Sequence, residues 1–134
     1  MLDVKDAVSV DIQALYSQQT TVNIDHMPPV AKTPEAIALF EWTNPIPEVS
    51  GGGSWHYIQL QVRSADPVKA RQKCARLVRL LDSGPNEKQF YHGVEYLIYR
   101  PRRGAILLER ATNTCTYAAE IAVWCNDNEE DNDE

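Results

Sequence analysis

The side chains that could do chemistry in this chain of 134 residues are few and lie far apart. His26, His56 and His92 have no carboxylate or cysteine at a metal-ligand spacing such as that of H-x₃-H or H-E-x-x-H. Cys74 falls on the apolar stripe of a predicted helix, where a free thiol behaves as a small hydrophobic group, and no neighbouring base is evident. We therefore expect no catalytic residues, no metal site and no cofactor, and hence a protein that is not an enzyme.

Three consecutive glycines, Gly51, Gly52 and Gly53, could suggest a phosphate-binding loop. A Walker loop needs Lys-Ser/Thr directly after its last glycine and then a helix, whereas here Ser54 opens a predicted strand. The glycines instead indicate a flexible hairpin tip.

Two basic groups are the remaining candidates for a site. Arg100, Arg102 and Arg103 form a compact cluster around Pro101 at a predicted strand end. This cluster fits equally well a solvated turn or a contact for acidic neighbours or nucleic acid. A second group forms one face of a predicted helix and consists of Lys69, Arg71, Lys73, Arg76 and Arg79. Such helix faces are most often solvated, and neither stretch interleaves aromatic residues as single-strand binders do.

The formal net charge of −6 arises from 13 Lys and Arg residues against 19 Asp and Glu residues. Residues 127–134 hold six of the acids, so the rest of the chain has 13 residues of each sign. Residues 1–48 have two basic and seven acidic residues, whereas residues 49–110 have eleven basic and five acidic residues. This asymmetry predicts either surfaces of opposite sign that pair between copies or a basic face for a polyanion. We expect residues 127–134 to be an acidic, disordered tail.

The cysteines and the N-terminus indicate a compartment. Cys74, Cys115 and Cys125 are odd in number and lack C-x-x-C spacing, which favours a reducing environment. Asp3 and Asp6 stand where a secretory signal would carry bases before an apolar block, and no apolar stretch is long enough to span a bilayer. We expect a cytoplasmic protein with no membrane contact.

The apolar periodicity predicts a set of helices and strands that positions these residues. The expected elements are a helix over residues 2–17, strands over 20–24, 35–42 and 54–63, and a helix over 67–81. They are followed by a strand over 90–99 that is interrupted near Gly93, and by strands over 105–109 and 114–125. Asp66 and Pro67 give the second helix a clear start, and strands 35–42 and 54–63 form a hairpin that holds the glycines. In strand 54–63 we expect Trp55 and Tyr57 to share the buried face. The order predicts an α+β fold of one domain, residues 1–126, with a mainly antiparallel sheet, two helices packed on one face and a long hairpin loop.

Four segments together suggest a family. They are Ala36-Ile37-Ala38-Leu39-Phe40-Glu41-Trp42-Thr43-Asn44-Pro45, Trp55-His56-Tyr57-Ile58-Gln59-Leu60-Gln61-Val62-Arg63, Ser64-Ala65-Asp66-Pro67 with Ala70 and residues 77–81, and Gly93-Val94-Glu95-Tyr96-Leu97-Ile98 with Pro101. In these segments the chain resembles the tail terminator, or tail completion, proteins of long-tailed phages, a family that includes proteins grouped as minor capsid proteins. Two features depart from the family pattern, namely the acidic tail and Glu109-Arg110-Ala111, which stands where the family has a Gly-Arg pair.

The resemblance implies an α+β subunit of a ring, usually a hexamer, that caps the head-proximal end of the tail tube. The ring would stop polymerisation of the major tail tube protein, join the head connector or stopper protein, and let DNA pass without reading its sequence. It would lie in the neck of the virion, after assembly in the host cytoplasm. Candidate contact or lumen residues are Ser50, Gly51, Gly52, Gly53, Ser54, Arg100, Arg102 and Arg103. The alternative is a cytoplasmic nucleic-acid-binding module that uses the basic helix and the arginine cluster.

Overall fold

The computed structural model describes residues 2–41, 46–47 and 52–126. The elements are α1 (Val4–Leu15), β1 (Val22–Ile24), β2 (Ala36–Glu41), β3 (Ile46–Pro47), β4 (Ser54–Ser64), α2 (Pro67–Leu81), β5 (Phe90–His92), β6 (Glu95–Arg110) and β7 (Cys115–Cys125). The two predicted helices are confirmed. The predicted tail, as well as Ser50 and Gly51, lies outside the described residues.

The strands form one sheet in the order β1-β2-β4-β7-β6-β5, and β3 pairs with β4 at the side of this path. The α+β class is confirmed, but the sheet is mixed and not mainly antiparallel as expected, because β1 and β2 are parallel. The reason lies in the connection between them, residues 25–35, which contains three prolines. This connection is too long and too rigid for a tight hairpin, and it carries the chain back so that β2 starts beside the start of β1.

The expected hairpin is present as the antiparallel pair β2 and β4. Its register aligns Ala36 with Arg63 and Glu41 with Ile58. β4 pairs over its full length with β7, from Ser54 opposite Cys125 to Ser64 opposite Cys115. β4 and β7 therefore form the long centre of the sheet.

The prediction of two separate strands that end at residue 99 and begin at residue 105 is wrong, because one strand, β6, covers both. It runs without interruption from Glu95 to Arg110, with register shifts on either side of Arg103 and again between Leu107 and Glu109. Pro101 does not end the strand, because a sheet edge tolerates a residue that lacks an N–H. In the part of the chain that the structure describes, β6 has no strand on its outer side beyond Leu97. The arginine cluster is thus in the middle of an edge strand and not at a strand end.

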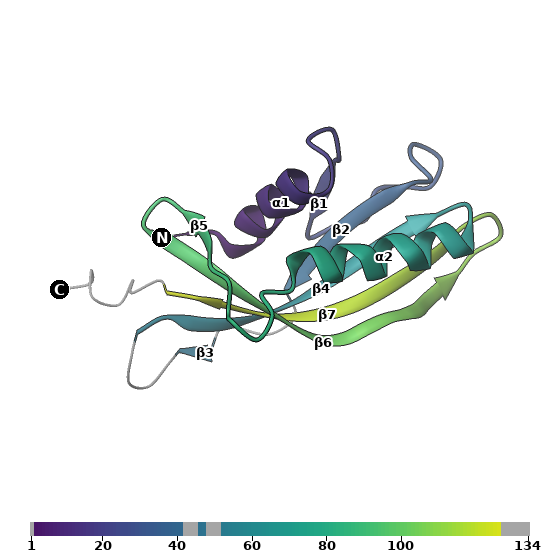
Figure 1. Ribbon diagram of the computed structural model, residues 1–134. Coiled ribbons are helices and arrows are strands. Elements are labelled where there is room, and N and C mark those ends of the chain that lie inside the picture. The colour runs from purple at the N-terminus through teal and green to yellow at the C-terminus, as the bar shows by residue number, and fades with distance from the viewer. Residues whose placement is uncertain (1, 42–45, 48–51, 127–134) are drawn as a thin grey trace.

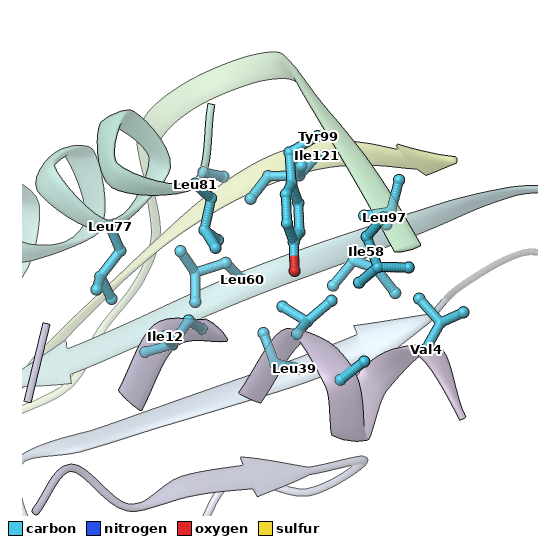
Figure 2. Packing of buried hydrophobic residues seen from close by; sticks show 14 of the residues in the cluster. Val4, Ile12, Leu39, Ile58, Leu60, Leu77, Leu81, Leu97, Tyr99 and Ile121 are labelled. Atoms are coloured by element: carbon cyan, nitrogen blue, oxygen red, sulfur yellow. The ribbon is translucent and has the colours of Figure 1, made fainter. Parts of the chain in front are cut away.

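Both helices lie on the same side of the curved sheet (Figure 1). Asp3 caps α1, and Asp66 caps α2 by accepting from the Val68 backbone N at 2.9 Å. Between the helices and the sheet is one apolar core (Figure 2), which contains Val8, Ile12, Leu39, Ile58, Leu60, Leu77, Leu81, Leu97, Tyr99 and Ile121 among others. Among the described residues, no helix covers the opposite side of the sheet, which we call the open face.

Candidate functional site

The prediction that Trp55 and Tyr57 lie on the buried face of β4 is wrong, because both residues lie on the open face. Ile58, Leu60 and Val62 are fully buried under the helices, so the alternation of a strand places Trp55 and Tyr57 on the other side. Trp55 lies opposite Trp124 of β7, which lies opposite Ile98 of β6. Large aromatic side chains of the central strands are therefore half-exposed on the face without helices.

Arginines of β6 stack on these aromatic rings. The guanidinium carbon of Arg100 lies 5.3 Å from the ring centre of Trp55, and that of Arg102 lies 5.0 Å from the ring centre of Tyr57. Arg100 also forms an exposed ion pair with Glu87. This stacking could not be predicted from the sequence, because the rings and the arginines come from strands more than 40 residues apart. Cation–π contacts of this kind are common at recognition surfaces.

Two shallow hollows on the open face share Trp55 and Arg100. The larger, of about 430 Å³, also includes Tyr96 and Trp124, whose ring centres are 5.8 Å apart. The smaller, of about 280 Å³, extends to Tyr57 and Arg102. Aromatic and arginine side chains around a concavity are the usual anchors of protein interfaces, so this face is the strongest candidate for a contact surface.

The far half of β6 adds an unpaired edge with apolar side chains. Ile106, Leu107 and Leu108 are 46%, 44% and 47% exposed, although they are consecutive large hydrophobic residues. β5 pairs with β6 only as far as Leu97, and Ser83 hydrogen-bonds to the backbone N and O of Tyr99. Within the described residues, the backbone from Arg100 to Arg110 then has no strand on its outer edge. A long free edge with exposed apolar residues is prone to pair with another chain.

The described part of the predicted glycine loop is packed and not a free tip. Gly53 has a φ of +95°, and a Cβ there would lie 2.6 Å from the Cys125 carbonyl oxygen and 2.8 Å from Trp124 Cζ2. Glycine is therefore required at this position by both space and backbone conformation. Gly52 precedes it in a bend, and Ser54 is already the first residue of β4.

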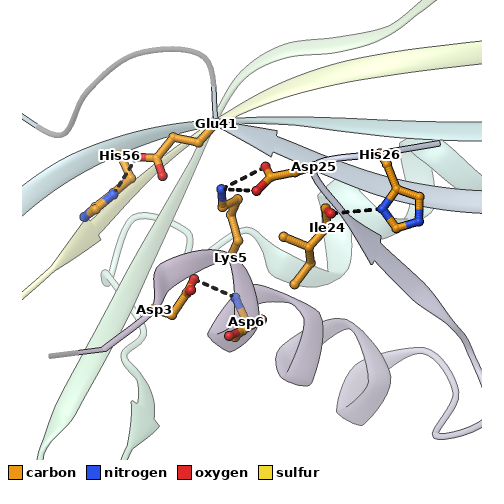
Figure 3. A network of polar contacts seen from close by, with 8 residues as sticks. All are labelled: Asp3, Lys5, Asp6, Ile24, Asp25, His26, Glu41 and His56. Atoms are coloured by element: carbon orange, nitrogen blue, oxygen red, sulfur yellow. Dashed lines mark hydrogen bonds and ion pairs between the residues drawn. The ribbon is translucent and has the colours of Figure 1, made fainter.

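Ser54 belongs to a hydrogen-bonded chain that the sequence did not reveal. His56 Nδ1 donates to Glu41 Oε2 at 2.7 Å (Figure 3), and His56 Nε2 lies 3.0 Å from Ser54 Oγ. The order of atoms is that of a nucleophile, a base and an orienting carboxylate. The three residues lie at the loop end of the β2–β4 hairpin, where the bond between His56 and Glu41 joins the two strands. None of them lines the hollows of the open face.

A second buried polar group links α1 to the other end of the sheet. Asp11 of α1 is only 8% exposed, and its Oδ2 accepts from the Tyr99 hydroxyl at 2.5 Å and from His92 Nε2 at 3.1 Å. Burial, together with the negative charge of Asp11 and its hydrogen bond, raises the pKa of Tyr99 well above its usual value. His56 and His92 thus both have specific carboxylate partners.

Several acids of residues 1–48 are used inside the subunit. Lys5 Nζ forms an ion pair with Asp25 at 2.8 Å (Figure 3), and this pair raises the pKa of the lysine. Glu35 accepts from Ser64 Oγ and from the Ala65 backbone N, both at 3.0 Å. Asp11 and Glu41 are also bound, so these four acids have partners within the subunit.

The basic face of α2 lies apart from the arginines of the open face. Lys73 and Arg76 stand over the ring of Tyr16, at 5.4 and 5.7 Å from its centre. These three residues and Lys69 line a separate hollow beside α2. Because α2 covers one side of the sheet and Arg100 and Arg102 stack on the other, the structure does not combine the two basic groups. Across the described residues, no cluster of three or more His, Cys, Asp or Glu side chains could hold a metal ion. The described helices are all too short or too polar to cross a bilayer.

Comparison with known proteins gives a structural likeness only. No model of a known protein family matches the sequence, and no curated protein matches it. A chain in the virion of a native gene transfer agent particle matches the fold with a TM-score of 0.65 and 16% identity, over 92% of this chain and 95% of that chain. A second solved structure, which carries no functional name, matches with a TM-score of 0.55 and 13% identity, over 90% of this chain and 94% of its own. At these identities the likeness shows that the chains share a fold.

Proposed function

We propose that this chain is a virion protein that forms a ring, a hexamer, on the head-proximal end of a phage tail tube. The ring ends polymerisation of the major tail tube protein, joins the tail to the head connector or stopper protein, and lets DNA pass through its lumen. The observation that carries the proposal is the near-complete fold match to a chain of a gene transfer agent virion, over 92% and 95% of the two chains. That match agrees with the resemblance of the sequence to tail terminators.

The surfaces of the subunit suit repeated contacts between copies. The free edge of β6 with its exposed apolar residues and the hollowed open face are different patches, so contact between them would be heterologous. Heterologous contacts close into rings when the rotation between neighbours allows it.

We propose a structural role and no catalysis. Labelling with a serine-directed fluorophosphonate tests this point at Ser54, and we expect no modification.

A gene deletion tests the proposed function. Phage that lack this chain are expected to make tails of unregulated length that do not join to heads, and expression from a plasmid should restore normal particles. Tails of normal length that attach to heads in the deletion strain would refute the proposal. The nucleic-acid-binding alternative predicts DNA binding that falls steeply with salt. The basic face of α2 and the arginines of β6, which this alternative uses together, lie on opposite sides of the sheet, so one DNA segment does not contact both.

A further inference from the structure

The open face and the acidic end of the chain meet at one residue. Asn126 is the last residue that the structure describes, and its Oδ1 accepts from the Tyr96 backbone N at 2.7 Å. Tyr96 lines the larger hollow of the open face together with Trp55, Arg100 and Trp124. The described chain therefore ends directly beside the aromatic and arginine side chains of that face.

We propose that residues 127–134 dock on the open face of their own subunit, along the arginine side chains of β6. Six of these eight residues are acidic, and the sequence is Asp-Asn-Glu-Glu-Asp-Asn-Asp-Glu. Carboxylates bind arginine guanidinium groups through charge-assisted hydrogen bonds, and the two asparagines can hydrogen-bond to polar groups between them. The docked segment would cover the hollows around Trp55.

The segment is long enough to reach its targets. Eight extended residues span about 26 Å. Arg100 lies four residues from Tyr96 along β6, about 13 Å, and Arg103 lies seven residues away, about 23 Å, at the usual rise of a strand. The segment must fold back over the open face, and the turn uses part of this length, so Arg100 and Arg102 are its nearest targets.

The charges of the open face leave room for an acidic ligand. Arg100 pairs with Glu87, and both side chains of this pair are about half exposed, so the carboxylate can be exchanged for another. Arg102 stands over Tyr57, and a guanidinium stacked on a ring keeps its edge free for carboxylates. Arg103 lies opposite Glu120 in the register of β6 and β7. The three arginines face these two acids, and the segment supplies six more.

Attachment in the same chain favours this occupant over an acidic segment of another molecule. A ligand joined through a short linker has an effective concentration in the millimolar range, which makes weak exposed ion pairs sufficient for docking. The basic face of α2 is the competing target within the chain, but it lies on the other side of the sheet. The docking does not depend on the proposed function, because it rests only on the charges and the position of residues in this chain.

The test compares the full chain with a chain that ends at Asn126. Nuclear magnetic resonance follows the side-chain N–H signals of Arg100, Arg102 and Arg103 and the indole signals of Trp55 and Trp124. In about 10 mM salt, where the screening length is about 30 Å, we expect these signals to differ between the two proteins. In about 1 M salt, where it is about 3 Å, we expect the difference to vanish. Both chains should give well-dispersed spectra, which shows that the shorter chain still folds.

Three variants make the test specific. Replacement of the six acids by Asn and Gln should give the spectrum of the shortened chain, and Arg102→Gln should reduce the difference several-fold. Arg71→Gln, which removes a comparable charge from exposed α2, is the matched control and should leave the difference unchanged. Identical low-salt signals for full and shortened chains would overturn the proposal. Changes at Lys69, Lys73 and Arg76 instead, or differences that grow with protein concentration, would also overturn it, because they would indicate docking on α2 or on another copy.

Discussion

The hydroxyl of Tyr99 should contribute measurably to folding, because it is buried and bound to a buried carboxylate. Tyr99 is 0% exposed, and its hydroxyl donates to Asp11 Oδ2 at 2.5 Å. Tyr99→Phe keeps the ring and removes only this donor, so the packing is preserved and Asp11 loses one of its two partners. Hydrogen bonds to charged groups contribute about 1.5–3 kcal/mol, so we expect the free energy of unfolding to fall by about 2 kcal/mol.

The same substitution should change the response to alkaline pH. Because the pKa of Tyr99 is raised in the folded state, the folded protein keeps the phenol proton above pH 10 while the unfolded chain loses it. The resulting stability is fully present below pH 10 and is lost as the pH rises further, with a slope of about 1.4 kcal/mol per pH unit. In Tyr99→Phe this part of the slope should be absent. Lys5, whose pKa is also raised, is common to both proteins and cancels in the comparison.

Urea unfolding of the two proteins between pH 7 and pH 11 measures both effects. The dependence of the free energy on urea should be the same in both proteins, since Phe buries the same surface. Tyr57→Phe on the open face is the matched control, and we expect a change within about 0.5 kcal/mol. A loss below about 0.5 kcal/mol for Tyr99→Phe, or an unchanged alkaline slope, would refute the proposed contribution of the hydroxyl to stability.

Three further substitutions test other parts of the structure. Gly53→Ala should destabilise the fold by about 2 kcal/mol or more in urea unfolding, because its Cβ would lie 2.6 Å from the Cys125 carbonyl oxygen at a φ of +95°, and a loss below about 0.5 kcal/mol would show that the turn can relax. Burial raises the pKa of the Cys74 thiol to about 12, so the thiol contributes to the loss of stability that begins as the pH rises above about 9. Cys74→Ala should remove this contribution, and an unchanged slope of the unfolding free energy between about pH 9 and pH 10 would contradict it. Leu108→Glu on the free edge of β6 should leave the unfolding free energy of the monomer within about 0.5 kcal/mol but weaken its assembly in light scattering, whereas Val94→Glu in the β5–β6 turn should change neither. If both glutamate variants assemble equally well, the free edge of β6 is not part of the interface.

Local signals in the sequence predicted the elements well. Asp66 and Pro67 mark the start of α2, and the apolar stripe of Ala70, Cys74, Leu77 and Leu81 is the face that the structure buries. The hairpin of β2 and β4 followed from two apolar strands around a glycine-rich loop, and its register is fixed over six residue pairs. Caps, periodicity and turn residues act within a few positions, so one sequence is enough to show them.

The candidate site could not be predicted, because it depends on which side of the sheet the helices cover. The strand pattern placed Trp55 and Tyr57 on the buried face, but the aliphatic residues at 58, 60 and 62 pack against the helices and turn the two aromatic side chains outward. Pro101 suggested a strand end, and only the edge position of β6 makes it compatible with a strand. The stacking of arginines on these rings therefore could be recognised only from the order of the strands in the sheet.

Electron microscopy of the protein mixed with its tail tubes tests the proposed function most directly. We expect a six-subunit ring of this chain at one end of each tube, and tubes capped in this way should no longer lengthen when tail tube protein is added. Tubes that bind the protein along their sides, or bind none, and that lengthen at the same rate in its presence would contradict the proposal.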